Sequence, residues 1–279
     1  MKYLTNYLPQ NGIVSSMKFY KCASVDGVNK TWSGYELLLQ NGKYTVSDTL
    51  TEGLTYSSIQ PAVEKVYTAD ALVQIALYYS GIPADGLMFY APFNNVSYTS
   101  ETGQPLVFSG VQATTRDGIP CVYFENKSSY IAVNDMFDPG TGDFTISLWL
   151  NYDRASAGWC VFLISGFNTA STRMSLLDNG QLETVIWGSG QINSNQLLDS
   201  NKWTHVVFMR KDGVMQHYIN GVKDSVTQSN TSSANLNDNF MFGSPDFGGY
   251  TGYMACARVY NRGLSEGEVQ ALFTEITPV

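Results

Sequence analysis

Apolar and polar residues alternate along much of the chain after residue 86, which is the pattern of β-strands with one buried face. The clearest example is the segment 143–150, whose alternate positions hold Phe144, Ile146, Leu148 and Leu150. β-rich stretches of the same kind cover residues 203–210 and 214–219. The pattern predicts half-buried strands in a mainly β domain.

Three tight-turn signals lie within a short stretch of sequence. Asn179-Gly180 joins residues 173–177 to residues 181–187, Asp212-Gly213 joins residues 203–210 to residues 214–219, and Asn220-Gly221 follows as the next turn. Such pairs readily adopt the positive φ angles that a two-residue hairpin turn requires. Consecutive hairpins predict antiparallel sheets.

The first 85 residues have a different pattern. Residues 35–39 and 43–46 flank an Asn-Gly pair and predict a hairpin, and residues 68–81 show a helical apolar spacing that starts at Thr68 and ends at Gly81. The apolar side of this helix would pack on the hairpin or line a subunit interface. Residues 80–86 resemble a linker, so we expect a small α+β domain at 1–85 and a second domain at 86–279.

A short helix is predicted near the carboxyl end. Ser265 and Glu268 form a capping box, and Leu264 and Val269 can form a hydrophobic staple across it. This helix would bury Val269, Leu272 and Phe273.

Three segments in this order carry a family resemblance: Asp-Phe-Thr-Ile-Ser-Leu-Trp at 143–149, Trp-Thr-His-Val-Val at 203–207 with Tyr-Ile-Asn-Gly at 218–221, and Ala-Arg-Val-Tyr-Asn-Arg-Gly-Leu-Ser at 257–265. Together with the opening segment 86–93, they resemble laminin-G-like, concanavalin-A-like domains over residues 87–275. The resemblance implies an antiparallel two-sheet jelly-roll sandwich. Members bind glycans, proteins or calcium, or accompany catalytic domains.

Charge and composition restrict the classes of binding partner that the chain could have. The formal net charge is -8, from 24 acidic and 16 basic residues without a basic run, so nucleic acid is a poor partner. The start of the chain lacks the apolar stretch of a secretory signal, and no segment is apolar enough for a membrane span. The four cysteines show no metal or redox spacing and are interpreted as buried free thiols.

The sequence lacks the usual signals of catalysis, so we expect no enzyme. It has no Gly-x-Ser-x-Gly turn, no phosphate-binding loop and no paired carboxylates on one strand. Glu183 is interpreted as a solvated outward residue, while His205 and His217 are interpreted as core or sheet-face residues.

Sugar recognition needs an aromatic face together with amides and carboxylates on well-positioned loops. The first candidate platform is Trp187, next to a Gly-Ser-Gly turn and followed by Asn193. Two further aromatic loops, 244–253 and 152–159, contribute the other candidate ligand-binding residues, namely Asp246, Tyr250, Tyr152 and Trp159. Trp149 and Trp203 are assigned to the core or the sheet face.

A cofactor is not expected. The family often places acidic residues just before the Arg-Val-Tyr-Asn run, where this chain holds Ala255, Cys256 and Ala257, so a family-type calcium site is in doubt. The hard oxygen ligands that calcium prefers could still come from Asp246, Asp238 and Asn94.

The leading hypothesis is a non-catalytic, carbohydrate-binding adhesion protein that displays its jelly roll on a virion or another extracellular surface. A phage fibre or capsid-decoration protein would fit a lectin-like fold without a secretory signal, with residues 1–85 docking on the virion or a scaffold protein and trimers or other homo-oligomers adding avidity. The alternatives are a structural protein–protein interaction module without sugar binding and, third, a glycan hydrolase or its accessory domain.

Overall fold

The chain divides into two compact units, residues 1–81 and 82–279. The computed structural model describes residues 82–153, 159–166, 171–245 and 248–276, together with the backbone of six strands between residues 3 and 66. The two units are treated separately below.

The first unit contains one antiparallel sheet with the strand order β4-β3-β2-β1-β6, to which β5 adds by pairing with β3. Its strands are β1 (Tyr3–Thr5), β2 (Ser16–Asp26), β3 (Asn29–Gln40), β4 (Lys43–Val46), β5 (Thr51–Thr55) and β6 (Lys65–Val66). Gln40 pairs with Lys43, which confirms the hairpin predicted around residues 41–42. The helix predicted at 68–81 lies outside the described residues.

The second unit is a sandwich of two antiparallel sheets. The first sheet has the order β19-β18-β17-β12-β21-β10-β9, and β7 pairs with one half of β21. Its strands are β7 (Leu87–Ala91), β9 (Val111–Arg116), β10 (Ile119–Phe124), β12 (Phe144–Tyr152), β17 (Thr204–Lys211), β18 (Val214–Ile219), β19 (Val222–Ser229) and β21 (Gly252–Tyr260).

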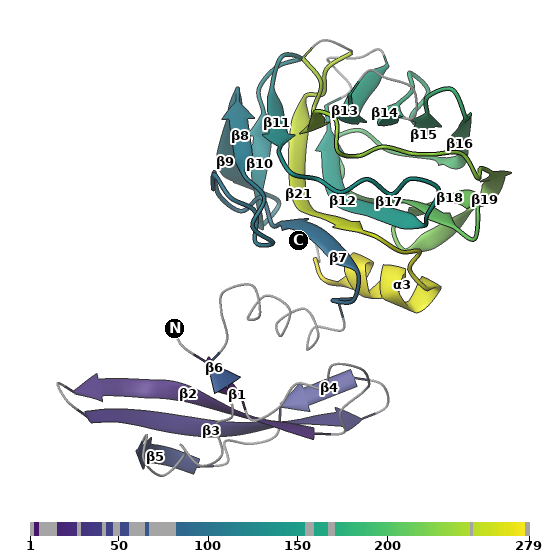
Figure 1. The fold of residues 1–279 in the computed structure, drawn as a ribbon. Coiled ribbons are helices and arrows are strands. Elements are labelled where there is room, and N and C mark those ends of the chain that lie inside the picture. Colours follow the sequence, from purple (N-terminus) through teal and green to yellow (C-terminus); the bar gives the residue numbers. More distant parts are fainter. Residues whose placement is uncertain are drawn as a thin grey trace. The chain divides into compact units, whose positions relative to one another are not determined.

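The second sheet has the order β16-β15-β14-β13-β20-β11-β8. Its strands are β8 (Leu106–Ser109), β11 (Tyr130–Val133), β13 (Cys160–Ser165), β14 (Thr172–Leu176), β15 (Gln181–Ile186), β16 (Gly190–Leu197) and β20 (Phe240–Phe242). Figure 1 shows the two sheets stacked face to face. The predicted mainly β, jelly-roll sandwich is confirmed.

The core fills the space between the sheets, and the alternate residues predicted at 143–150 are fully buried in it. Each such side chain contributes roughly 1.5–3 kcal/mol through burial. However, β12 is buried on both faces, whereas the sequence predicted one. The reason is the carboxyl-terminal helix, because the Trp149 ring stacks on Phe273 with 5.7 Å between ring centroids.

Two of the predicted turns have the expected geometry. Asp212 and Gly213 have φ angles of 51° and 69°, and Asn220 and Gly221 have φ angles of 52° and 77°. Positive φ at both central residues matches the twist of the flanking strands. The third turn, at Asn179-Gly180, is longer than a two-residue turn. The Leu177 N–H donates to the Gln181 carbonyl, so residues 178–180 lie between the two bonded residues.

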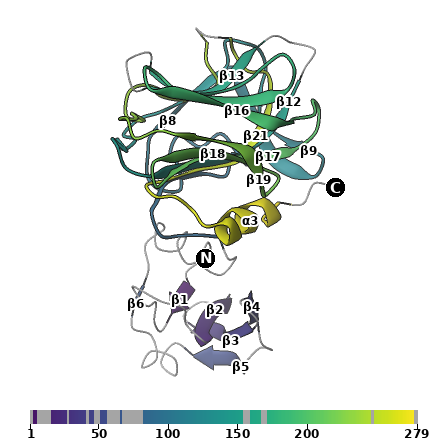
Figure 2. The same ribbon diagram turned by 90° about the vertical axis from the view of Figure 1, so that its right-hand side faces the viewer.

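The helix α3 (Glu266–Thr274) lies on the outer side of the eight-stranded sheet, as Figure 2 shows. Ser265 and Glu268 form the predicted capping box, and Val269 and Leu272 are buried as expected, whereas Phe273 is only partly buried. Beyond the helix, Glu275 accepts two hydrogen bonds of 2.6 Å from the buried Arg258 guanidinium. Both ends of the helix are thus fixed by side chains.

Candidate functional site

The outer face of the seven-stranded sheet over β14, β15 and β16 brings together several of the predicted site residues. Glu183 on β15 lies opposite Ser175 on β14 and Asn193 on β16. Since successive strand residues point to opposite faces, Val185 follows Glu183 on the same side. Trp187 is the first residue after β15 and continues this register, because its N–H donates to the Ser171 carbonyl. In Figure 2 the helix α3 covers the other sheet. We call this surface, with Arg173, Ser175, Glu183, Val185, Trp187, Gln191 and Asn193, the β15 face.

Trp187 is the exposed aromatic residue of the β15 face, with 48 % of its surface accessible. Its backbone N–H donates to the Ser171 carbonyl, and the Ser189 N–H donates to the Ile186 carbonyl within the same turn. Gly188 has a φ of 77°, which favours glycine. The turn therefore holds an indole ring with about half of its surface open to solvent, as a binding platform requires.

Glu183 has a different environment from the one the sequence predicted. Its carboxylate oxygen Oε2 accepts hydrogen bonds from Arg173 Nη2 at 2.7 Å, from Ser175 Oγ at 2.7 Å and from Trp159 Nε1 at 3.4 Å. The residue is only 6 % exposed. The interpretation as a solvated residue is wrong, because the side chains of Arg173, Ser175 and Trp159 surround the carboxylate.

Trp159 belongs to the same cluster and is half-buried. The Arg173 guanidinium carbon lies 4.7 Å from the centre of the Trp159 ring, a cation–π distance. On another side, the backbone of Gly248 lies so close that a Cβ there would be 2.8 Å from the ring. Trp159 therefore supports Arg173 and Glu183 and is less open to solvent than Trp187.

Asn193, a candidate from the sequence, lies on the β15 face together with Gln191, which the sequence analysis did not select. Gln191 pairs with Val185 across the strands, and its Nε2 donates to Asn193 Oδ1 at 3.3 Å. Residues two apart on a strand share a face, so the period-two pattern alone could have assigned Gln191 to the site.

Two predicted site residues face the core. Tyr152 is buried, and its hydroxyl donates to the Leu198 carbonyl at 2.9 Å. Tyr250 is 0 % exposed, and its hydroxyl donates to the Tyr253 carbonyl at 2.9 Å. The expectation that these rings are open to a ligand is wrong, because both rings fill the space between the sheets. Asp246 lies outside the described residues.

The two histidines have the structural roles expected from the sequence. His205 Nε2 lies 2.8 Å from Ser147 Oγ, and His217 Nε2 lies 2.8 Å from Thr184 Oγ1. Burial, with a smaller effect of Arg258, lowers the pKa of His205 to about 3. Burial also lowers the pKa of His217 to about 4. Both imidazoles are therefore neutral at physiological pH.

Ligands for a metal do not gather in the described part of the chain, where no three His, Cys, Asp or Glu residues could share an ion. Of the proposed calcium ligands, Asn94 is exposed and Asp238 is partly buried.

Cys121, Cys160 and Cys256 are free thiols. Cys121 is buried as expected, whereas the predicted burial is wrong for Cys160 and Cys256, which are partly buried. Among the described helices, none is long and apolar enough to cross a membrane.

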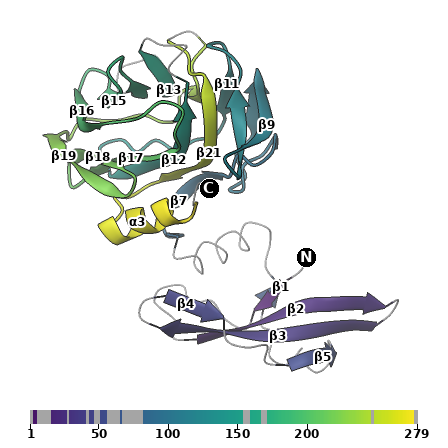
Figure 3. The ribbon, with the colours of Figure 1, turned by 180° about the vertical axis from the view of Figure 1, so that it is seen from behind.

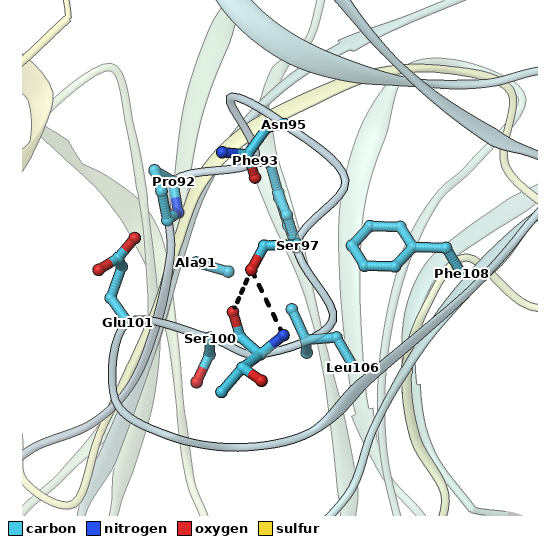
Figure 4. Close-up of a pocket in the computed structure, with 10 residues that line it drawn as sticks. Ala91, Pro92, Phe93, Asn95, Ser97, Ser100, Glu101, Leu106 and Phe108 are labelled. Atoms are coloured by element: carbon cyan, nitrogen blue, oxygen red, sulfur yellow. Dashed lines mark hydrogen bonds between the residues drawn. The ribbon is translucent and has the colours of Figure 1, made fainter.

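A small pocket lies elsewhere, between the loop after β7 and strand β8 (Figure 4). About 240 Å³ of empty space lies among its lining residues, and this value includes space that is open to solvent. Its polar groups largely serve the loop itself, since Ser97 Oγ donates to the Thr99 carbonyl and accepts from the Thr99 N–H. Glu101 is its charged residue, and Phe93 is buried. The pocket lacks the combination of an open ring and surrounding amides that the β15 face has.

Comparison with known families gives one match. A family model of the laminin G type matches residues 125–270. This family is described as the concanavalin A-like lectin/glucanases superfamily. This range includes every strand of the β15 face. No curated protein matches the sequence.

Several solved structures share the fold. The binding domain of Paraclostridial Mosquitocidal Protein 1 has 22 % identity and a TM-score of 0.55, with 67 % of this chain and 52 % of that one covered. The binding domain of Botulinum Neurotoxin DC in complex with SialylT has 15 % identity and a TM-score of 0.57, with 68 % and 51 % covered. The chain thus spans about half the length of these toxin domains.

A third similar structure is domain 4 of AbnA, a GH43 extracellular arabinanase from Geobacillus stearothermophilus, in complex with arabinotriose. It has 18 % identity and a TM-score of 0.53, and the match covers 67 % of this chain and 97 % of that domain. At these identities the likeness concerns the fold.

Proposed function

Because this chain belongs to the concanavalin A-like lectin/glucanases superfamily, we propose that its sandwich binds a glycan on the β15 face and that the protein is a non-catalytic adhesion protein. The observation that carries the proposal is the half-exposed Trp187 on the same sheet face as Gln191 and Asn193. Structures with the same fold were solved with arabinotriose and with SialylT, which supports a sugar as the ligand.

The chemistry of the face suits this role. An indole ring packs against the C–H surface of a sugar and contributes apolar contact area, while side-chain amides donate to and accept from its hydroxyl groups. Trp187 supplies the ring, and Gln191 and Asn193 supply the amides. Strand β16 positions both amides and the turn after β15 positions the ring, so little conformational entropy would be lost when a ligand binds.

The surroundings of Glu183 favour binding over hydrolysis. Glycoside hydrolysis uses two carboxyl groups roughly 5–9.5 Å apart. The cross-strand neighbours of Glu183 are Ser175 and Asn193, neither of which is a carboxylate. Moreover, the oxygen Oε2 of Glu183 already accepts three hydrogen bonds. In this account Glu183 organises the face and does not react.

The biological setting is a further part of the proposal. A jelly roll displayed on a phage virion, as part of a fibre or a capsid decoration, would contact host-surface or mucosal glycans. The first unit would attach it to the particle or to a scaffold protein, and a homo-oligomer such as a trimer would strengthen single weak sugar contacts through effective concentration.

The test is binding of the purified chain to a broad array of bacterial and host glycans, with and without calcium. We expect a specific signal that is lost in Trp187→Ala. The matched control is Tyr98→Ala, because Tyr98 is 75 % exposed and lies outside the β15 face. Absence of any signal under both conditions would contradict the proposal and favour a structural interaction module.

A further inference from the structure

His205 lies beneath the carboxyl-terminal helix α3, in a group of three aromatic rings. The centroid of its imidazole is 5.3 Å from that of the Trp149 ring and 6.2 Å from that of the Phe273 ring. His205 itself is 0 % exposed. Figures 2 and 3 show α3 on the outer side of the sheet that contains β12 and β17, the strands of Trp149 and His205. Phe273 on α3 therefore helps to separate this imidazole from solvent.

Hydrogen bonding beneath the helix is incomplete. His205 Nε2 lies 2.8 Å from Ser147 Oγ, whereas Nδ1 has no hydrogen-bond partner among the described residues. The neighbouring Trp149 Nε1 also lacks a partner there. Polar atoms that are buried without a partner are unfavourable, because they have lost their bonds to water. Movement of α3 away from the sheet would restore those bonds.

The charged group that acts on His205 is a cation. From β21, the buried guanidinium of Arg258 opposes a positive charge on the imidazole, and Glu275 beyond α3 is bonded to that guanidinium at 2.6 Å. Burial raises the pKa of the other titratable groups around Arg258, namely Tyr90, Cys256 and Tyr260, so they are neutral at pH 7. The side chains that β12, α3 and the turn after β18 place against His205 do not titrate, namely Ser147, Trp149, Phe273 and Asn220.

The helix α3 depends on its contacts with the sheet. It has nine residues, and isolated helices shorter than about 12–15 residues are marginal in water. Val269 and Leu272 are buried beneath it. The turn after β18 packs so closely that a Cβ at Gly221 would lie 2.6 Å from Gln270 Oε1 and 3.1 Å from Phe273 Cδ1. A helix that leaves the sheet therefore unfolds, which exposes its backbone amides to exchange with solvent.

We propose that protonation of His205 releases α3 from the eight-stranded sheet, so that this helix is an acid-sensitive cover over Trp149. A protonated ring would place a second positive charge near Arg258 in a site that is closed to solvent. Water reaches the ring when α3 leaves, so the proton binds mainly to the released state. The inference goes beyond glycan binding and does not depend on it, because the β15 face belongs to the other sheet.

Acid favours release because the ring binds a proton more tightly in the released state. Burial and Arg258 lower the pKa of His205 to about 3 while α3 is docked, and contact with water returns it towards its ordinary value of 6.5. Docking is therefore little affected above about pH 7 and weakens as the pH falls from 6.5 towards 3. Between about pH 7 and pH 5, the released population should rise roughly 20-fold.

The test is hydrogen–deuterium exchange of the full chain at pH 7 and pH 5, with each rate corrected for the intrinsic pH dependence of exchange. We expect the protection of α3 amides to fall roughly 20-fold, and that of β12 and β17 to fall less. His205→Gln, which keeps a hydrogen-bonding group near Ser147, should lose the response. His217→Gln is the matched control and should keep it, because His217 lies between the sheets, 2.8 Å from Thr184 Oγ1.

Two results in the wild type would overturn the proposal. The first is equal corrected protection of α3 at both pH values. The second is a fall by the same factor in α3, β12 and β17, because protonation would then open the whole sandwich. A response kept in a folded His205→Gln variant, as checked by circular dichroism, would also overturn the role of this ring. None of these results bears on glycan binding, which the array tests separately.

Discussion

At the residue scale, the β15 face depends on one buried carboxylate. Glu183 connects Arg173, Ser175 and Trp159 through hydrogen bonds to a single oxygen. A buried ion pair gains its stability from such surrounding hydrogen bonds, because the removal of two charges from water is costly. Loss of the carboxylate alone is therefore more harmful than loss of both charges.

We expect Glu183→Ala to lower the free energy of unfolding by about 3 kcal/mol, because it removes the carboxylate partner of Arg173 from a largely buried site. Urea unfolding measures this change. The double variant Arg173→Met with Glu183→Leu removes both charges and should be less destabilised than Glu183→Ala. A double variant that is destabilised by the sum of the two single changes would show that the pair does not act as a unit.

The two histidines make stability depend on pH. In the folded state the pKa values are about 3 for His205 and about 4 for His217, both below the ordinary value of 6.5. The unfolded chain binds protons first as the pH falls below about 6.5, so stability decreases on acidification. At pH 5 the expected loss is roughly 2 kcal/mol for each histidine.

Urea unfolding between about pH 7 and pH 5 measures this effect, in a window above the ordinary carboxyl pKa range. His205→Gln, which keeps a hydrogen-bonding group near Ser147, should show about half of the loss. A free energy of unfolding that stays constant from pH 7 to pH 5 would contradict the buried, neutral state of these rings.

Individual residues show which side-chain environments could not be predicted from the sequence. The period-two pattern placed Glu183 on an outer face correctly, but its burial depends on Trp159, a distant residue that the pattern cannot connect to it. Tyr250 and Tyr152 stand in polar, glycine-containing stretches typical of loops, yet both rings fill the core. Trp187 was selected because it stands beside a Gly-Ser-Gly turn, and it is 48 % exposed in that turn.

At the element scale, local sequence predicted several strands of the sandwich, whereas others, such as β16 and β19, were not predicted. Asp212-Gly213 and Asn220-Gly221 form hairpin turns with positive φ, and the capping box starts α3 where expected. The two-sided burial of β12 could not be predicted, because it needs Phe273 of α3 to lie on Trp149. Local patterns thus gave the elements, and long-range packing decided which faces they bury.

We expect Ser265→Ala to lower the free energy of unfolding by about 1 kcal/mol, since it removes the side chain that caps the first turn of α3. Ser265→Asp keeps an acceptor at this position and adds a favourable charge near the helix start, so it should stay close to the wild type. Equal stability of Ser265→Ala and the wild type in urea unfolding would contradict a stabilising cap.

At the scale of the whole molecule, the fold places two different surfaces on the sandwich. The eight-stranded sheet carries α3, which the Arg258–Glu275 pair fixes at its end. The seven-stranded sheet presents the β15 face with its exposed indole. Under the proposed function, the seven-stranded sheet would carry recognition, while the eight-stranded sheet packs against α3.

The most direct test of that account is a calorimetric titration of the purified chain with an oligosaccharide identified on the array, compared with Trp187→Ala and the control Tyr98→Ala. We predict saturable binding by the wild type and by Tyr98→Ala, and at least tenfold weaker binding by Trp187→Ala, as expected for a stacked ring at the centre of the site. Equal affinity of Trp187→Ala and the wild type would contradict the β15 face as the site of recognition.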